Sequence, residues 1–458
     1  MNLEQLRATF HDLELRSNFF SRKQLGKTSI WDIVRADVWW LLQSKIGLWS
    51  VPSPEGLKPK GYQRYYLLFK NVIAVFVELG VLAAAITQKK QYICFTASRT
   101  QRDERYVDSV AQDILEELGR RVFVIESCHY GNIRFQLTSR LLGLWCKLCH
   151  FRYSKNDEFT EEIVYSFKPF VMENELTATV NSCVERYKKE FLYYKFLFKL
   201  LKPKHIFLVQ NGIQKALIAA ANANTIKLTE IQHGLVNIYH PVYSYPSEIP
   251  VKLGLNTVPN FLLTFSEFWC KNANMPGCKN ISIGNNNYYN ESIRNELIEN
   301  KLLFILADIY ENDFIQLIHQ VRKCNENIKI IAKLHPNQYS SKVRVSSKFH
   351  NSDNVEVIGA EFTTSQLLPN VTAVVVIQST VSYEALQVGV PVFIYKIRDY
   401  CVHGDLFQNP IVKTFQSAEE LCRITCNPPR PNNTNMESFF RAFSPTDFRN
   451  FISTVTEG

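Results

Sequence analysis

The sequence has little that would place it outside a reducing compartment or inside a membrane. Residues 1–23 are polar and charged and contain no apolar core of a secretory leader. The eleven cysteines are scattered without a disulfide-like spacing. The longest apolar run, Tyr65–Thr87, contains Lys70 and Glu78, two charges that disfavour a membrane-spanning helix. We therefore expect a cytoplasmic protein in which this run forms a buried or partly interfacial helix.

Several motifs that indicate metal, nucleotide or nucleophile chemistry are also missing or incomplete. There is no Asp-x-Asp, no Gly-x-Ser-x-Gly and no glycine fingerprint of a kinase or dinucleotide-binding protein. Gly26-Lys27-Thr28 resembles the end of a P-loop, but position 21, where the first glycine belongs, is Ser21. Cys146 to His150 matches the c-type haem pattern within an apolar helical run, which favours structural cysteines. The sequence therefore predicts neither a metal site nor a cofactor.

Length and charge indicate the architecture and the kind of partner. A chain of 458 residues is too long for one ordinary core, so two domains are expected. The formal charge of +9 favours an anionic partner such as a nucleotide, a phospholipid or an acidic glycan. No dense basic block or nucleic-acid motif is present, which argues against nucleic acid. Trp39, Trp40, Trp49, Lys58 and Lys60 would allow peripheral contact with the cytoplasmic membrane.

A short β-α-β unit in the middle of the chain ends in a polar cluster. His205–Val209 and Ile226–Ile231 are predicted strands, joined by an Ala-rich helix. Their carboxyl ends carry Gln210-Asn211-Gly212 and Gln232-His233-Gly234, and Glu230 lies in the second strand. Ligands bind at this edge of an open α/β sheet. The alternative is that Glu230 faces solvent and His233 caps a turn.

A second unit precedes the first. Gln91–Ala97 and Arg121–Ile125 are predicted strands, and Val107–Leu118 is a predicted amphipathic helix between them. The loop Ser98–Arg105 would lie on the same ligand-facing edge, where Arg99 and Arg102 could hold an anionic substrate. A solvated charged turn is an equally good interpretation of these arginines.

The C-terminal half repeats the alternation of strands and helices. Leu302–Leu306, Ile328–Lys333, Thr372–Ile377 and Pro391–Tyr395 are apolar runs typical of a parallel sheet covered by helices. His335 and the pair Ser379-Thr380 would follow two of these strands at one edge. The predicted organisation is a helical N-terminal region (1–90), an N-terminal Rossmann-like domain (91–260), a linker near 285–290, a C-terminal Rossmann-like domain (286–425) and a terminal helix that packs back (436–458).

Several of these motifs, taken together, resemble those of a known class of enzymes. Lys333-Leu334-His335-Pro336, followed by Ser379-Thr380 and Glu384-Ala385, resembles the GT-B glycosyltransferases of bacterial surface polysaccharide synthesis. Within that class, a His-Pro motif followed by a Ser-Thr motif is similar to the sialyltransferases and Kdo transferases, which use CMP-activated acidic sugars. Glu230-x-Gln232-His233-Gly234, with Tyr239-His240-Pro241 after it, is similar to capsule and O-antigen transferases. The resemblance covers about residues 90–425.

The resemblance implies an α/β, GT-B-like fold, with two Rossmann-type domains facing across a cleft and extra N-terminal helices. It implies a nucleotide-sugar donor and a glycan or lipid-linked glycan acceptor, without a metal. The implied catalytic residues are Glu230 as base or nucleophile, His233, and His335 at the leaving phosphate. The implied donor-binding residues are Gln232, Gly234, Lys333, Pro336, Ser379, Thr380 and Glu384. Acceptor binding would fall to Arg99, Arg102, Gln210 and Asn211.

One departure from the family pattern leaves the donor and the mechanism open. The bacterial sialyltransferases carry a double acidic motif followed by glycine in the N-terminal half, and here the strand ends carry amides and a lone Glu230. A retaining Kdo-type transferase therefore fits at least as well as an inverting sialyltransferase. A GT-B enzyme with a UDP-sugar, GDP-sugar or CDP-polyol donor is also compatible with these residues, as is a non-catalytic, membrane-associated polysaccharide assembly protein.

Overall fold

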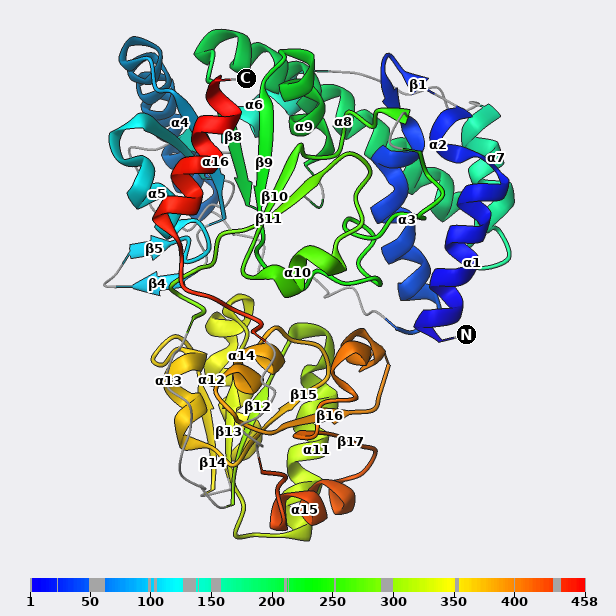
Figure 1. Cartoon of the computed structure of the whole chain (residues 1–458), viewed down its shortest axis with the longest axis vertical. Coiled ribbons are helices and arrows are strands. Elements are labelled where there is room, and N and C mark those ends of the chain that lie inside the picture. The colour runs from blue at the N-terminus through cyan, green and yellow to red at the C-terminus, as the bar shows by residue number, and fades with distance from the viewer. Residues whose placement is uncertain are drawn as a thin grey trace.

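The computed structural model describes most of the chain (Figure 1). The described residues are 2–22, 24–48, 62–97, 100–102, 105–126, 137–138, 140–149, 158–209, 212, 214–250, 253–289, 300–350, 354–398, 400–430 and 438–457. Arg99, Gln210 and Asn211, three of the predicted acceptor contacts, lie outside these ranges. Arg102, the fourth, is in the short strand β4 (Thr100–Arg102), which pairs with β5 (Arg105–Val107).

The N-terminal domain contains a parallel seven-stranded sheet. Its strands lie in the order β11-β10-β9-β8-β3-β6-β7. Buried β-branched and aromatic residues dominate the central strands, as expected for a sheet covered on both faces. The bounds are β3 (Tyr92–Thr96), β6 (Val122–Glu126), β7 (Leu137–Thr138), β8 (His205–Val209), β9 (Lys227–Ile231), β10 (Phe261–Thr264) and β11 (Lys279–Ser282). The last two strands extend this sheet beyond position 260.

The C-terminal domain contains a parallel six-stranded sheet in the order β14-β13-β12-β15-β16-β17. This order, with crossover helices between strands, is Rossmann-type. The prediction of two Rossmann-type domains in a GT-B-like chain is confirmed. The bounds are β12 (Lys301–Ile305), β13 (Lys329–Lys333), β14 (Val355–Ile358), β15 (Ala373–Val376), β16 (Val392–Tyr395) and β17 (Val412–Phe415).

Helices cover both sheets, and extra N-terminal helices form a separate layer against the long helix α8 (Figure 1). Trp39, one of the residues that would allow peripheral membrane contact, is only 2% exposed and packs edge-on against Phe10 in this layer. The N-terminal half contains α1 (Leu3–Arg16), α2 (Phe19–Arg22), α3 (Ile30–Lys45), α4 (Tyr62–Gln88), α5 (Gln112–Leu118), α6 (Arg140–Leu148), α7 (Glu158–Phe167), α8 (Glu173–Leu201), α9 (Lys215–Ala223) and α10 (Glu267–Asn272). The C-terminal half contains α11 (Glu311–Cys324), α12 (Lys342–Ser346), α13 (Thr364–Leu367), α14 (Val381–Gln387), α15 (Ala418–Cys426) and α16 (Pro445–Glu457). Among the described helices, none has the length and apolarity to cross a membrane.

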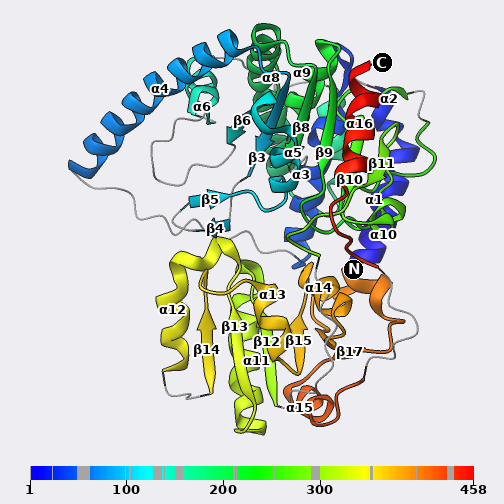
Figure 2. The ribbon, with the colours of Figure 1, turned by 60° about the vertical axis from the view of Figure 1, so that its left-hand side comes forward.

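The chain crosses back to the N-terminal domain at its end. Helix α16 packs Phe448 and Phe451 against the N-terminal sheet, where Phe207 of β8 lies 5.9 Å from Phe448 between ring centroids. Figure 2 shows α16 standing beside β10 and β11, far from the C-terminal sheet. The returning segment is held by backbone hydrogen bonds, Asn285 N–H to Arg441 O at 2.9 Å and Ser444 N–H to Ile283 O at 2.9 Å. The two domains are therefore connected by two crossings of the chain.

Gly284 is required at this double crossing. Its φ of +82° is a conformation that residues with a side chain rarely adopt, and an added Cβ would lie 2.1 Å from the carbonyl oxygen of Ala442. We expect Gly284→Ala to lower the free energy of unfolding by about 2–4 kcal/mol, because strain and a backbone clash add. Chemical denaturation of both proteins measures this difference.

Gly143→Ala is the matched control. Gly143 lies in α6 at ordinary φ, with nothing within 4 Å of an added Cβ. Alanine is the better helix former, so this variant should be as stable as wild type or slightly more so. Equal stability of Gly284→Ala and wild type would contradict the assigned crossing.

Candidate functional site

The predicted site residues of the C-terminal domain lie at one edge of its sheet. His335 follows β13 by two residues, and Ser379 follows β15 by three. Both strands flank β12, so their ends are about 10 Å apart across the sheet. His335 and Pro336 are exposed, and Ser379 and Thr380 are half-buried. One phosphorylated ligand could therefore contact both strand ends.

Hydrogen bonds of the buried Lys333 side chain hold the loop that carries His335. The Lys333 side chain is 5% exposed, and its ammonium group donates to the carbonyl oxygens of Leu334 (3.4 Å) and Gly359 and to the Tyr339 hydroxyl (3.1 Å). Burial lowers the pKa of Lys333 to about 8. Its donors are thus directed to the protein, and Lys333 holds the His335 loop in place.

A second set of contacts fixes the same loop from the side. The backbone N–H of His335 donates to the Gln338 side-chain oxygen at 3.2 Å. The Gln338 amide donates to Glu311 at 2.8 Å, and Arg344 donates to both Glu311 oxygens at 2.6 and 2.9 Å. This buried amide and bidentate ion pair leave the loop little freedom, so His335 is presented in a defined place.

Ser379 is held by a histidine that the sequence motifs did not indicate. The Ser379 backbone N–H donates to His403 Nε2 at 3.2 Å, and the Ser379 Oγ accepts from the Val381 N–H at 3.2 Å. His403 is fully buried, and burial lowers its pKa to about 3. It is therefore neutral, with Nε2 as acceptor. Because a polar segment follows β16, the rule that ligands lie at strand ends could have found it.

Two further groups of helix α14 lie beside Ser379. The Tyr383 hydroxyl donates to the Asp405 carboxylate, at 2.9 and 3.1 Å from its two oxygens. Glu384 is half-buried, and burial raises its pKa to about 7. No side chain in the described part of the chain pairs with the Glu384 carboxylate. A carboxylate in this state is suited to accept hydrogen bonds from hydroxyl groups of a ligand.

In the N-terminal domain, two predicted site residues are used by the protein itself. Glu230 is 0% exposed and accepts a hydrogen bond of 2.6 Å from the Tyr243 hydroxyl. Gln232 is also 0% exposed; its side chain accepts from the Phe265 N–H and donates to the Gly234 carbonyl, each at 3.0 Å. Both therefore order the turn that follows β9. His233 and Gly234 come next and are half-buried. The role of Glu230 as base or nucleophile stays a prediction, and its burial weighs against it.

The loop that carries His233 contacts the C-terminal domain. Asn237 Nδ2 donates to the Val402 carbonyl at 3.3 Å. Val402 precedes His403, the residue that binds the Ser379 N–H. Beside this contact, Trp269 of α10 packs against Tyr383 of α14 with ring centroids 4.7 Å apart. The loops at the carboxyl ends of the two sheets thus meet, at a residue four positions after His233 and at the residue before the His403 that holds Ser379.

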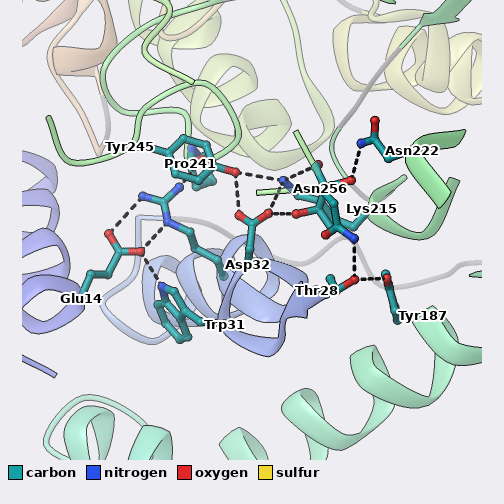
Figure 3. A network of polar contacts seen from close by, with 12 residues as sticks. Glu14, Thr28, Trp31, Asp32, Tyr187, Lys215, Asn222, Pro241, Tyr245 and Asn256 are labelled. Atoms are coloured by element: carbon teal, nitrogen blue, oxygen red, sulfur yellow. Dashed lines mark hydrogen bonds and ion pairs between the residues drawn. The ribbon is translucent and has the colours of Figure 1, made fainter. Parts of the chain in front are cut away.

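A buried ionic network anchors the same loop to the N-terminal helices (Figure 3). Arg35 of α3 is 2% exposed and pairs with Glu14 of α1; it also donates to the carbonyl oxygens of Pro241 and Ser244, the latter at 2.9 Å. Its guanidinium carbon lies 4.4 Å from the Tyr245 ring centroid. Arg35 thus ties α1 and α3 to the segment that follows His233.

Next to Arg35, Asp32 accepts hydrogen bonds from Tyr245 (2.7 Å), from Thr257 and from Lys215 (3.4 Å). Lys215 is the first residue of α9, and burial lowers its pKa. These partners are up to 225 residues apart, so no local pattern in the sequence indicates them. In the described ranges, no group of three His, Cys, Asp or Glu side chains could hold a metal ion.

Comparisons with known proteins give only distant similarities. No family model and no curated protein matches the sequence. Among solved structures, UDP-GlcNAc 2-epimerase of Methanocaldococcus jannaschii, in complex with UDP-GlcNAc and UDP, is 14% identical with a TM-score of 0.46, over 80% of this chain and 99% of that one. The Neisseria meningitidis UDP-GlcNAc 2-epimerase bound to UDP-GlcNAc is 13% identical, with the same TM-score and coverage. Acinetobacter baumannii MurG is 10% identical with a TM-score of 0.37, over 73% and 89% of the two chains. Similarities this distant do not identify an activity.

Proposed function

We propose that this protein is a glycosyltransferase that transfers an acidic ulosonate sugar from a CMP-activated donor to a glycan or lipid-linked glycan. The observation that carries the proposal is the junction of the two sheets. The contacts Ser379–His403 and Val402–Asn237 join a hydroxyl-bearing strand end of one domain to the His233 loop of the other. Reactive groups on both sides of one junction are what transfer between two bound substrates requires.

The C-terminal domain would bind the nucleotide. Ser379 and Thr380 would donate hydroxyl hydrogen bonds to the phosphate, and Glu384 would accept from the ribose hydroxyls. His335, exposed at the end of β13, would donate to the phosphate as it leaves. A donor aimed at developing negative charge stabilises the transition state.

The N-terminal domain would bind the acceptor. His233 would take the proton of the acceptor hydroxyl, since it is on the loop that reaches the junction and Glu230 is bonded to Tyr243 in the interior. Gln232 and Gly234 would set the position of His233 through the turn that they form. The bond formed joins the acceptor oxygen to the anomeric carbon, the bond to the phosphate oxygen breaks, and CMP leaves.

A nucleotide panel tests the proposal. We expect millimolar CMP to raise the melting temperature by a few degrees more than CDP, UDP, GDP or ADP, because a ligand that binds only the folded state stabilises it. The stabilisation by CMP should be larger at pH 8 than at pH 6. Glu384 has a pKa of about 7 and is mostly ionised at pH 8, when its carboxylate accepts ribose hydrogen bonds best. Differential scanning fluorimetry at both pH values measures these shifts.

Glu384→Gln should reduce the rise in melting temperature that CMP causes, and also the dependence of that rise on pH. Glu356 is an exposed carboxylate on β14, so Glu356→Gln should leave both unchanged. Any pH dependence that remains in Glu384→Gln belongs to other titratable groups at the site, the phosphate of CMP and His335. Selective stabilisation by UDP or GDP would reject the CMP donor and retain a nucleotide-sugar enzyme. Absence of any response would instead favour the non-catalytic assembly protein.

A further inference from the structure

Helix α4 exposes an apolar stripe on the outside of the N-terminal domain. Its most exposed large side chains are Val72 (48%), Ile73 (38%), Phe76 (69%), Leu79 (47%) and Ile86 (37%). Their spacing places them along one side of the helix. The opposite side carries Ala74, Glu78 and Ala85, which are buried. Figure 2 shows α4 as a long helix at the edge of the molecule, with α6 beside it.

Two neighbouring helices, α6 and α8, also expose large apolar side chains. Helix α6 exposes Leu144 (42%) and Leu148 (69%), and the end of α8 exposes Leu192 (39%), Phe196 (62%) and Leu200 (36%). The three helices contact one another. Together they hold ten of the seventeen large apolar side chains that are exposed in the described part of the chain. Apolar side chains concentrated in this way on a folded protein indicate a binding surface.

Specific contacts fix the three helices relative to one another. Glu78 of α4 is 1% exposed, accepts from the Leu141 N–H at 3.2 Å and pairs with Arg140 at 3.4 Å. The Trp145 indole of α6 donates to the Lys189 carbonyl of α8 at 2.9 Å. The Glu78 carboxylate of α4 is thus paired inside the cluster. The exposed face of α4 carries no acidic group among the described residues.

The same surface is basic. On α8, Leu192, Lys195, Phe196, Lys199 and Leu200 are all exposed and follow the spacing of one helix face. Leu144, Lys147 and Leu148 repeat this combination on α6. The segments 72–90, 140–148 and 188–204 hold ten Lys and Arg residues and two Glu residues, a surplus of eight positive charges in a chain whose net charge is +9.

We propose that α4, α6 and the end of α8 form a docking surface for an anionic lipid bilayer. Apolar side chains interleaved with lysines on a helix face are the pattern of helices that lie in the membrane interface, and the lysines meet anionic headgroups. Two copies of this chain would bring the same lysines face to face, so charge repulsion opposes self-association through this surface. A lysine-rich apolar face instead complements a negatively charged surface that can accept apolar side chains.

Vesicle flotation tests the proposal with the full-length protein. Wild type should float with vesicles of phosphatidylcholine and phosphatidylglycerol at low salt, and should remain unbound with phosphatidylcholine alone or in 0.5 M salt. Phe76→Ser with Leu148→Ser should lower the partition coefficient at least tenfold, since burial of two large apolar side chains is lost. Lys195→Gln with Lys199→Gln should lower it by about fivefold for each lysine.

The control is Val343→Ser with Phe362→Ser. These side chains are 83% and 48% exposed but lie on the C-terminal domain, so vesicle binding should be unchanged. The melting temperature of each variant shows whether it is folded. Failure of wild type to bind anionic vesicles, or equal binding by Phe76→Ser with Leu148→Ser, would overturn the proposal. So would a dimer in sedimentation velocity that this double variant abolishes, because the surface would then join two copies.

Discussion

Replacing Arg35 by methionine is expected to lower the free energy of unfolding by about 3–5 kcal/mol. The change leaves the Glu14 carboxylate buried and without its cation, which is among the most costly single substitutions in a folded protein. It also removes the donors to the Pro241 and Ser244 carbonyl oxygens. Denaturant unfolding of Arg35→Met and wild type measures the difference, and the segment after His233 should loosen with it.

The loss of unfolding free energy in Arg35→Met should depend on pH in a defined direction. Burial is the largest influence on Glu14 and raises its pKa, while Arg35 lowers it. Without Arg35 the carboxyl pKa rises further, so the folded variant retains a proton that the unfolded chain releases. The unfolded state then binds fewer protons, and the stability of Arg35→Met falls as pH rises above the ordinary Glu pKa of about 4.3. The deficit relative to wild type is therefore larger at pH 8 than at pH 5.

Two controls separate this explanation from a simple packing defect. Arg16→Met breaks an exposed ion pair with Asp12 one turn away and should cost less than about 0.5 kcal/mol. Glu14→Leu combined with Arg35→Met removes both charges and should recover much of the lost stability. A double variant as unstable as Arg35→Met, with no pH dependence in either, would contradict the buried-charge explanation.

The sequence predicted those elements whose apolar pattern is local and continuous. The strand expected at His205–Val209 has these bounds in the structure. Buried strands of parallel sheets are short β-branched runs, and the sequence of α11 shows a clear helical periodicity. Both patterns can be recognised within a few residues. The two strands after position 260, β10 and β11, belong to the N-terminal sheet, an assignment that no local pattern could indicate.

The candidate site was predictable only as a set of strand ends. His335 and Ser379 were expected at one edge of the sheet, and the strand order places them there. The sequence did not indicate on which face of its strand the Glu230 side chain lies. A strand alternates between its faces, and sequence does not tell which face will hold Tyr243. The ion pair between Glu14 and Arg35 was equally hidden, because such partners are chosen by tertiary packing.

Replacing His335 by alanine is expected to lower the transfer rate by about 10²–10³-fold, the loss typical when one donor to a developing negative charge is removed. His335 is exposed, so the variant should keep the melting temperature of wild type. The measurement is the single-turnover rate with the donor that the nucleotide panel selects. The control His350→Ala removes another exposed histidine of the same domain and should leave the rate unchanged.

Lys333→Met adds a test of how His335 is positioned. Lys333 holds the loop through the Leu334 and Gly359 carbonyl oxygens, so this variant should lower kcat more than it raises KM, because His335 would remain present but misplaced.

Retention of the transfer rate within about threefold in His335→Ala would remove His335 from the mechanism. The leaving phosphate would then be stabilised from the other strand end, by Ser379 and Thr380, and the matched loss should appear in Ser379→Ala.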